Sequence, residues 1–234
     1  MSKKNLLKIW NKIPIEENKD KLIAIPNCFK FFNPHPYFDL GAPYSTKNNI
    51  WKLREEVVKR LIKVNDYLKS RDKSFHLLIY DSWRPLEVQE FMFNRAFRLE
   101  CERLDIQASI KDMEEYPLIK KKVEEFWAYP SFDEKCPPPH STGGALDITL
   151  ADSCGNIVNM GSNIDQMDEK SKPDFYNNVE KEEAIIFNDR RNLLKEIMLE
   201  FVFVQHPNEW WHFSYGDQLW AWKNKKASAL YGKI

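Results

Sequence analysis

Two short segments in the second half of the chain carry the residue types that a hydrolytic metal site requires. The first is His140-Ser-Thr-Gly-Gly-Ala-Leu-Asp147, and the second is Glu209-Trp-Trp-His212. Zn²⁺ in a catalytic site takes three protein ligands, such as imidazole nitrogens and carboxylate oxygens, and keeps a fourth position for water. His140, Asp147 and His212 would fill three positions. Glu209 would then be free to accept a proton from the water, so the set indicates metal-dependent hydrolysis.

The spacing of these four residues leaves a purely structural interpretation open. A His or Asp taken alone is more often a hydrogen-bonded core residue or a surface residue than a ligand. The two segments are also less specific than HExxH, in which one helix fixes both imidazoles. Glu209 and His212 lie three residues apart, so in a regular strand their side chains would face opposite ways. A turn that extends to Glu209, or a bulge, is therefore needed for both side chains to reach one metal ion.

The intervening regions predict the elements that must position these residues. Hydrophobic residues at three- and four-residue spacing predict helices, and short β-favouring runs predict strands. Three prolines directly before His140, and two glycines after it, argue against a helix that joins His140 to Asp147. The expected helices cover residues 48–69, 86–104, 111–128 and 179–200, and the expected strands cover residues 75–80, 145–150, 201–205 and 210–215.

The order of these elements predicts one domain over residues 1–234, of the α+β fold class, with a central antiparallel sheet flanked by helices. Residues 1–46 are expected to form an irregular N-terminal part packed on this domain. A hairpin with its turn at 206–208 would place His212 beside the strand of Asp147. Arg84 lies where a predicted strand meets a predicted helix, and such a junction is a usual place for a functional side chain.

Composition and charge argue against several classes of partner. The chain has 35 basic and 35 acidic residues, so no net field favours nucleic acid or an anionic membrane. No apolar run reaches the length of a transmembrane helix, and residues 1–20 lack the apolar core of a signal peptide. We therefore expect a cytoplasmic protein without membrane insertion, with periplasmic export by another route left open. The four cysteines are irregularly spaced and include no CxxC motif, which favours unpaired thiols.

Taken together, the motifs resemble the D-alanyl-D-alanine dipeptidase family of zinc peptidases, the group that contains the vancomycin-resistance dipeptidase. The resemblance covers roughly residues 75–222. It implies a fold of the D,D-peptidase/hedgehog type and hydrolysis of D-Ala-D-Ala, or a related short D-amino-acid dipeptide, in cell-wall precursor turnover or recycling. The segments that carry it are His140-x-x-Gly143-x-Ala145-x-Asp147, Glu209-Trp-Trp-His212, Tyr80-Asp-Ser-Trp-Arg84-Pro85, Met160-Gly161…Asp165 and Phe213-Ser-Tyr-Gly-Asp.

The resemblance also implies roles for the residues of the two main segments. His140, Asp147 and His212 would hold one Zn²⁺ ion per chain. Glu209 would be the catalytic base, which accepts the proton of the attacking water and passes it to the departing amine. A small peptide is thus the expected partner, and the sequence predicts no oligomeric state.

Roles for two further residues come from the same resemblance. Arg84 would stabilise the negative charge that develops on the scissile carbonyl oxygen, since a guanidinium does not lose its proton. Asp165 would meet the free amino group of the substrate. The family commonly has Ser two residues before the first His, where this chain has Pro138. Proline offers neither a hydroxyl nor a backbone N–H, so any substrate contact made there must be supplied by another group.

Two other functions remain open at this point. A D,D-carboxypeptidase or endopeptidase acting on longer peptidoglycan stem peptides would use the same metal site, but such relatives usually have Pro where this chain has Trp210. A catalytically idle zinc-binding module is disfavoured by Glu209, because a purely structural site needs no base. Of the other histidines, His35 and His76 are interpreted as structural, and His206 as a hydrogen-bonding neighbour of the site.

Overall fold

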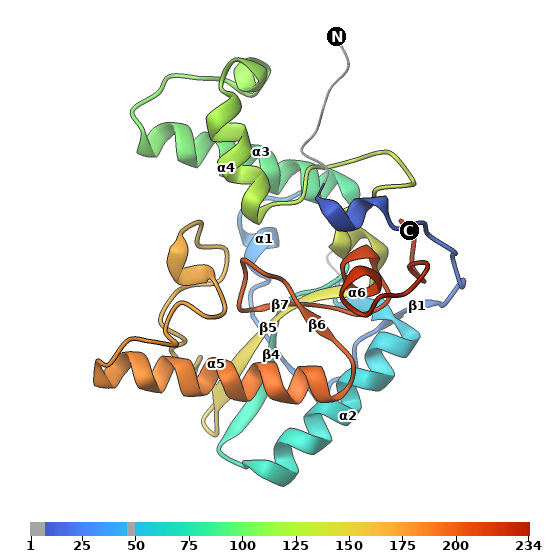
Figure 1. Cartoon of the computed structure of the whole chain (residues 1–234), viewed down its shortest axis with the longest axis vertical. Coiled ribbons are helices and arrows are strands. Elements are labelled where there is room, and N and C mark those ends of the chain that lie inside the picture. Colours follow the sequence, from blue (N-terminus) through green and yellow to red (C-terminus); the bar gives the residue numbers. More distant parts are fainter. Residues whose placement is uncertain (1–7, 46–49) are drawn as a thin grey trace.

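The structure, a computed structural model, describes residues 8–45 and 50–234 (Figure 1). The helices are α1 (Pro36–Asp39), α2 (Glu55–Arg71), α3 (Leu86–Arg103), α4 (Pro117–Phe126), α5 (Glu182–Glu200) and α6 (Gln218–Lys223). Short 3₁₀ helices are η1 (Ile9–Lys12), η2 (Ile110–Glu115), η3 (Pro139–Thr142) and η4 (Glu169–Ser171). The strands are β1 (Leu22–Ala24), β2 (Lys30–Phe31), β3 (Lys52–Arg54), β4 (Phe75–Asp81), β5 (Ala145–Asp152), β6 (Val204–Gln205) and β7 (His212–Ser214).

A five-stranded sheet with the order β2-β4-β5-β7-β6 forms the centre of the fold. The pairs β4–β5, β5–β7 and β7–β6 are antiparallel, and β2 joins the edge parallel to β4. The expected α+β domain with a central antiparallel sheet is thus confirmed, and the N-terminal part adds a short parallel edge strand to it. β1 and β3 pair separately in a small antiparallel sheet.

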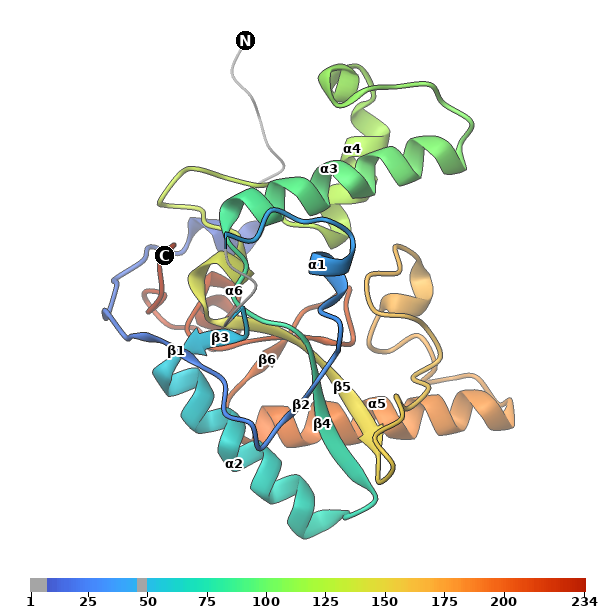
Figure 2. The ribbon, with the colours of Figure 1, turned by 180° about the vertical axis from the view of Figure 1, so that it is seen from behind.

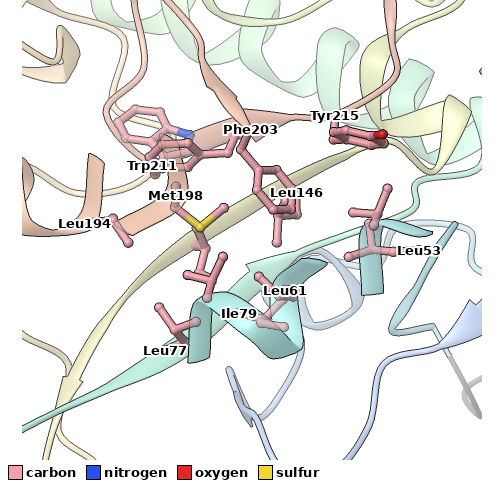
Figure 3. Close-up of a cluster of buried hydrophobic side chains, with 14 of the residues drawn as sticks. Leu53, Leu61, Leu77, Ile79, Leu146, Leu194, Met198, Phe203, Trp211 and Tyr215 are labelled. Carbon is pink, nitrogen blue, oxygen red and sulfur yellow. The ribbon is translucent and has the colours of Figure 1, made fainter. Parts of the chain in front are cut away.

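Helices α2 and α5 pack on the same face of the sheet and enclose the main apolar core (Figures 1 and 2). Leu61 of α2, Ile79 of β4, Leu146 of β5 and Met198 of α5 are fully buried and point toward one another in Figure 3. Burial of each such side chain contributes on the order of 2 kcal/mol. Because β5 lies inside this core, the position of the chain between Ala145 and Asp152 is closely fixed.

A second apolar cluster lies between α1, α3 and α4, on the opposite side of the sheet from α5 (Figure 1). Phe93 and Phe97 of α3 and Val123 of α4 are fully buried in it. Tyr37 of α1 and Trp127, which follows α4, are also buried members of this cluster. The candidate residues lie on segments that pack into one or other of these two clusters.

The structure corrects two of the predicted helices. α2 begins at Glu55 rather than at residue 48; residues 48 and 49 lie outside the described residues, and Lys52–Arg54 is a strand paired with β1. That partner strand lies about thirty residues earlier, so local hydrophobic spacing could not reveal it. The expected helix 111–128 is divided into η2 and α4. The division falls at Pro117, which lacks a backbone N–H and suits the first turn of a new helix.

The C-terminal hairpin is also shorter than predicted. The strand expected at 201–205 is reduced to β6, because the chain turns after α5 with a positive φ of 68° at Val202. The strand expected at 210–215 is reduced to β7, which begins at His212. The turn before it therefore includes Glu209, and this satisfies the condition under which Glu209 and His212 can face the same site. α5 begins at Glu182, three residues later than expected.

Two expectations drawn from composition agree with the structure. In the part of the chain that the structure describes, no helix is both long and apolar enough to span a membrane. Cys28, Cys101, Cys136 and Cys154 are all free thiols.

Gly216, between β7 and α6, allows a test of how closely the backbone packs against Tyr231. Its φ is +80°, and a Cβ at this position would collide with the ring of Tyr231, which is fully buried. We expect Gly216→Ala to destabilise the protein by more than about 2 kcal/mol, because it adds steric overlap to an unfavourable backbone conformation. Thermal unfolding would measure this as a fall of roughly 4–8 °C in Tm.

Gly41→Ala is the matched control for that substitution. Gly41 has a similar φ of +84°, but a Cβ there would meet no atom within 4 Å. Its substitution should therefore show only the backbone cost, about 1 kcal/mol. Equal losses of Tm in the two variants would mean that contact with Tyr231 contributes nothing.

Candidate active site

Two neighbouring strands and a 3₁₀ helix bring the three expected metal ligands together. Asp147 of β5 lies directly opposite His212 of β7 in the antiparallel register. His140 lies on η3, which ends at Gly143 in the left-handed conformation, just before the chain enters β5. One potential ligand atom from each of the three residues lies within 4.8 Å of the others. All three side chains are buried, so the arrangement is held by the fold.

Both imidazole rings are oriented by a partner on the nitrogen that faces away from this cluster. Nδ1 of His140 donates to the carbonyl oxygen of Ser82 at 2.8 Å, and Nε2 of His212 lies 3.3 Å from Oγ of Ser214. Because a carbonyl oxygen only accepts, His140 carries its lone pair on Nε2, and the hydroxyl of Ser214 can accept from His212 Nε2 in the tautomer that leaves a lone pair on Nδ1. The two lone-pair atoms face each other at 3.1 Å. Metal-binding histidines are commonly fixed in this way, through a hydrogen bond on the other ring nitrogen.

The three candidate ligands are close enough together to bind one metal ion. Zinc bonds of about 2.0–2.1 Å at tetrahedral angles separate two ligand atoms by roughly 3.3 Å. The two imidazole nitrogens, His140 Nε2 and His212 Nδ1, are 3.1 Å apart. His212 Nδ1 lies 3.1 Å from Asp147 Oδ1, and His140 Nε2 lies 3.4 Å from the other carboxylate oxygen, Oδ2. Three protein ligands leave the open position that a hydrolytic zinc site requires.

Glu209 lies beside this cluster, in the turn that precedes β7. Its Oε2 is 3.5 Å from His212 Nδ1, and its Oε1 is 3.4 Å from Nδ1 of His206. The side chain is buried, and burial raises the pKa of Glu209 to about 8. A carboxyl group with a pKa near neutrality can both accept and release a proton at neutral pH, which is the property that a general base requires.

Arg84, at the junction of β4 and α3, lies beside the Asp147 carboxylate of the cluster. Its Nη2 is 3.6 Å from Asp147 Oδ2. Asp81 accepts from Nε at 3.0 Å and from Nη2 at 2.7 Å, while Gln89 accepts from Nη1 at 2.7 Å. Burial lowers the pKa of Arg84, but the Asp81 carboxylate outweighs it, so the pKa stands above its ordinary value. The guanidinium is thus charged and held rigidly.

Asp165 lies next to Arg84 in the polar loop between β5 and α5. The hydroxyl of Tyr37 donates to Oδ1 and Oδ2 of Asp165 at 3.1 and 3.0 Å, and the hydroxyl of Tyr80 donates to Oδ2 at 3.2 Å. Tyr37 also accepts from Arg84 Nη2 at 3.2 Å, which links Asp165 to the guanidinium. Burial raises the pKa of Asp165 to about 7, and the nearby Asp147 carboxylate adds to this effect. A bound ammonium group would stabilise the charged form.

All six predicted site residues line one pocket. Trp127 from the second apolar cluster and Trp211 from the main core also line it, so the pocket lies where the two clusters meet. The full lining is Lys8, Arg84, Gln89, Phe126, Trp127, Ala128, Pro139, His140, Asp147, Asp165, His206, Glu209, Trp211 and His212.

Comparison with known proteins identifies the family of the chain. Residues 34–229 match the profile of the peptidase family M15, described as D-Ala-D-Ala dipeptidase. The chain belongs to this family. It is 38% identical over 241 residues to the D-alanyl-D-alanine dipeptidase of Synechocystis, an alignment that covers 97% of each chain. It is 29% identical over 145 residues to the dipeptidase of Enterococcus faecalis, which covers 62% of this chain and 64% of that one. The family predicted from the motifs is thus confirmed, and the chain is a peptidase.

Among solved structures, the chain resembles a variant of the vancomycin-resistance D,D-pentapeptidase VanY from a VanB-type cassette, in complex with Zn(II). The TM-score is 0.49 at 14% identity, and the alignment covers 92% of this chain and 90% of that chain.

In this family member, the residues that support the site were not found from the sequence. Tyr37, Gln89 and Lys8 have no motif around them, and they reach the site only through the fold. Asp81 lies inside a quoted motif, but its contacts with Arg84 and with His35, whose Nε2 is 3.2 Å from Oδ1, could not be read from spacing. Tyr37, Gln89 and Asp81 hold Asp165 or Arg84 in place, whereas Lys8 contacts His206.

His206 lies at the pocket, whereas Pro138 lies outside its lining. His206 lines the pocket but is not part of the three-residue ligand cluster. Burial, followed by the nearby charge of Lys8, lowers the pKa of His206 well below its usual value, so the ring is neutral. Pro138 is buried, its carbonyl accepts from the N–H of Ser141 at 3.0 Å, and it does not line the pocket. No substrate contact is therefore available from its side chain.

Proposed function

We propose that this peptidase is a zinc-dependent dipeptidase that hydrolyses D-Ala-D-Ala, or a related short D-amino-acid dipeptide, in cell-wall precursor turnover or recycling. The observation that carries the proposal is the convergence of His140, Asp147 and His212, with a hydrogen-bonding partner on the outer nitrogen of each imidazole and Glu209 beside them. Family membership gives the substrate class.

His140 Nε2, His212 Nδ1 and one carboxylate oxygen of Asp147 would hold the ion. A bound zinc ion acts as a Lewis acid and makes water a nucleophile at neutral pH. The buried carboxylate of Asp147 supplies the negative charge that offsets the cation, and Ser82 and Ser214 keep the two rings in the binding orientation.

Glu209 would move the proton during hydrolysis. It accepts the proton of the attacking water and then donates it to the nitrogen of the departing D-alanine. Its position in the turn before β7 places both carboxylate oxygens against imidazole rings, 3.4 Å from His206 and 3.5 Å from His212. These contacts hold the carboxylate at the edge of the ligand cluster, where the water must be activated.

Arg84 would stabilise the negative charge on the scissile carbonyl oxygen as the tetrahedral centre forms. A guanidinium has five N–H donors. Asp81 takes two of them, and Gln89 and Tyr37 take one each. Within the described residues, one N–H on Nη1 is therefore left without a protein acceptor. This N–H is available to the substrate, while the other four hold the group in place.

Asp165 would receive the free amino group of the dipeptide. The two tyrosine hydroxyls hold its carboxylate in place, and the carboxylate lines the same pocket as the ligand cluster. A site that recognises the free amino terminus favours a dipeptide over a chain that extends further at that end.

The direct test is an assay of purified protein on D-Ala-D-Ala, its L,L isomer and an acetylated tripeptide that ends in D-Ala-D-Ala. We expect hydrolysis of the D,D dipeptide alone, loss of that activity with a chelator, and recovery when Zn²⁺ is returned. Efficient cleavage of the acetylated tripeptide would instead indicate a D,D-carboxypeptidase with the same metal site.

Replacement of Asp165 tests the proposed amino-group contact. Asp165→Asn keeps the shape of the side chain and one acceptor oxygen for the tyrosine hydroxyls, but removes the charge. We expect KM for D-Ala-D-Ala to rise by about 30-fold, as for loss of one partner of a buried charge pair, with a smaller effect on kcat. Asp174→Asn, on an exposed part of the same loop, is the control. An unchanged KM in the Asp165 variant would remove Asp165 from the substrate site.

A further inference from the structure

Lys8 lines the active-site pocket although it lies outside residues 34–229, which match the family. It directly precedes η1, and its ammonium Nζ lies 3.4 Å from Nε2 of His206. The N-terminal part of the chain therefore contributes a positive charge to the site, whereas the site residues predicted from the sequence all lie between Arg84 and His212.

The segment that carries Lys8 is fixed on the body of the protein. The side-chain amide of Gln218 on α6 donates to the carbonyl oxygens of Asn11 and Ile13, at 3.2 and 2.6 Å. The ring of Trp10 packs against His206 and Trp222, with centroids 5.9 and 5.7 Å apart. These contacts set the position of the backbone next to Lys8, so the side chain is directed into the pocket by the fold.

The charge of Lys8 has no direct counterion in the described part of the chain. Burial lowers the pKa of Lys8, and the attraction of the Glu209 carboxylate, with weaker contributions from Glu124 and Glu125 on α4, opposes this effect. The ion-pair contacts of Glu209, however, are with His206 and His212. Within the described residues, the polar group in contact with Nζ is the ring of His206. An ammonium group that lines a pocket without a contacting carboxylate favours binding of an anion.

A continuous series of contacts joins Lys8 to Asp165 through the ligand cluster, and Lys8 lies at the end nearer to Glu209. From Lys8 the series runs through His206 and Glu209 to His212, and from Asp147 it continues through Arg84 and Tyr37 to Asp165. Glu209, on the Lys8 side, is the group that would protonate the departing amine. That amine belongs to the C-terminal residue of the dipeptide, which also carries the free carboxylate.

We propose that Lys8 binds the C-terminal carboxylate of the dipeptide substrate, and so makes the N-terminal part of the chain a specificity determinant. This inference rests on the proposed function. The ammonium and carboxylate of a dipeptide would then meet Asp165 and Lys8, groups of opposite charge at the two ends of the contact series.

The test compares D-Ala-D-Ala with its C-terminal amide, which lacks the carboxylate charge, in wild-type protein and in Lys8→Met. We expect wild type to favour the free acid by about 30-fold or more in kcat/KM, and the variant to lose most of this preference. The amide is measured both as a substrate and as a competitive inhibitor of D-Ala-D-Ala hydrolysis, so that slow turnover still yields an affinity. Lys8→Arg should retain the preference, and Lys12→Met, at an exposed lysine of η1, is the matched control.

The outcomes separate this inference from the proposed function. If wild type fails to hydrolyse D-Ala-D-Ala with zinc bound, the proposed function is wrong. If wild type is active and Lys8→Met keeps the preference for the free acid, Lys8 does not bind the carboxylate. An equal loss on acid and amide would likewise overturn the inference, because it would mean that Lys8 acts on Glu209 or on the fold.

Discussion

Glu209→Gln should reduce kcat on D-Ala-D-Ala by about 10³-fold while the protein still binds one zinc ion per chain, since general acid–base catalysis contributes on the order of 10²–10⁴. The substitution keeps the size of the side chain and removes the group that accepts and returns the proton. Glu209 is not part of the three-residue ligand cluster. Steady-state kinetics, with zinc measured on the same samples, would record both results.

Glu196→Gln is the matched control for this variant. Glu196 is an exposed glutamate of α5 that contacts only Arg71, at 3.4 Å, among the described residues. It should retain full activity and full zinc content. If Glu209→Gln kept turnover within tenfold of wild type, another group would have to serve as the base.

His212→Ala should abolish both zinc binding and hydrolysis. It removes one of three ligands, and it leaves the buried Asp147 carboxylate without the contact that it makes at 3.1 Å. A catalytic zinc site needs three protein ligands, and only two would remain. We therefore expect less than one zinc ion per chain and turnover at the level of wild-type protein treated with a chelator.

His76→Ala provides the comparison for the ligand variant. His76 lies on β4, pairs with Ala151 of β5, and does not line the pocket. It should retain one zinc per chain and near wild-type kinetics. Full zinc content in His212→Ala would show that the ion binds elsewhere.

The sequence predicted which side chains lie together better than it predicted the bounds of the elements around them. His140, Asp147 and His212 could be selected because ligand chemistry restricts residue types strongly, and because the glycines and prolines near them limit the local backbone. The position of Pro85 correctly predicted the start of α3. In contrast, β3 was missed because its conformation depends on pairing with β1, which is distant in sequence.

The supporting residues were missed for a related reason. Tyr37 reaches Asp165 across 128 residues, and Lys8 reaches His206 across 198. No local pattern encodes such contacts, because they arise only when α1, η1 and the C-terminal hairpin pack around the sheet. The same holds for Gln89, whose amide donates to the carbonyl of Ala128 while its oxygen holds Arg84.

A crystal structure of the purified protein with anomalous data collected on both sides of the zinc absorption edge would test the central claim most directly. We predict a single zinc peak per chain, about 2.0–2.2 Å from His140 Nε2, His212 Nδ1 and a carboxylate oxygen of Asp147. A peak bound by other residues, or its absence from protein that hydrolyses D-Ala-D-Ala in the presence of a chelator, would contradict it.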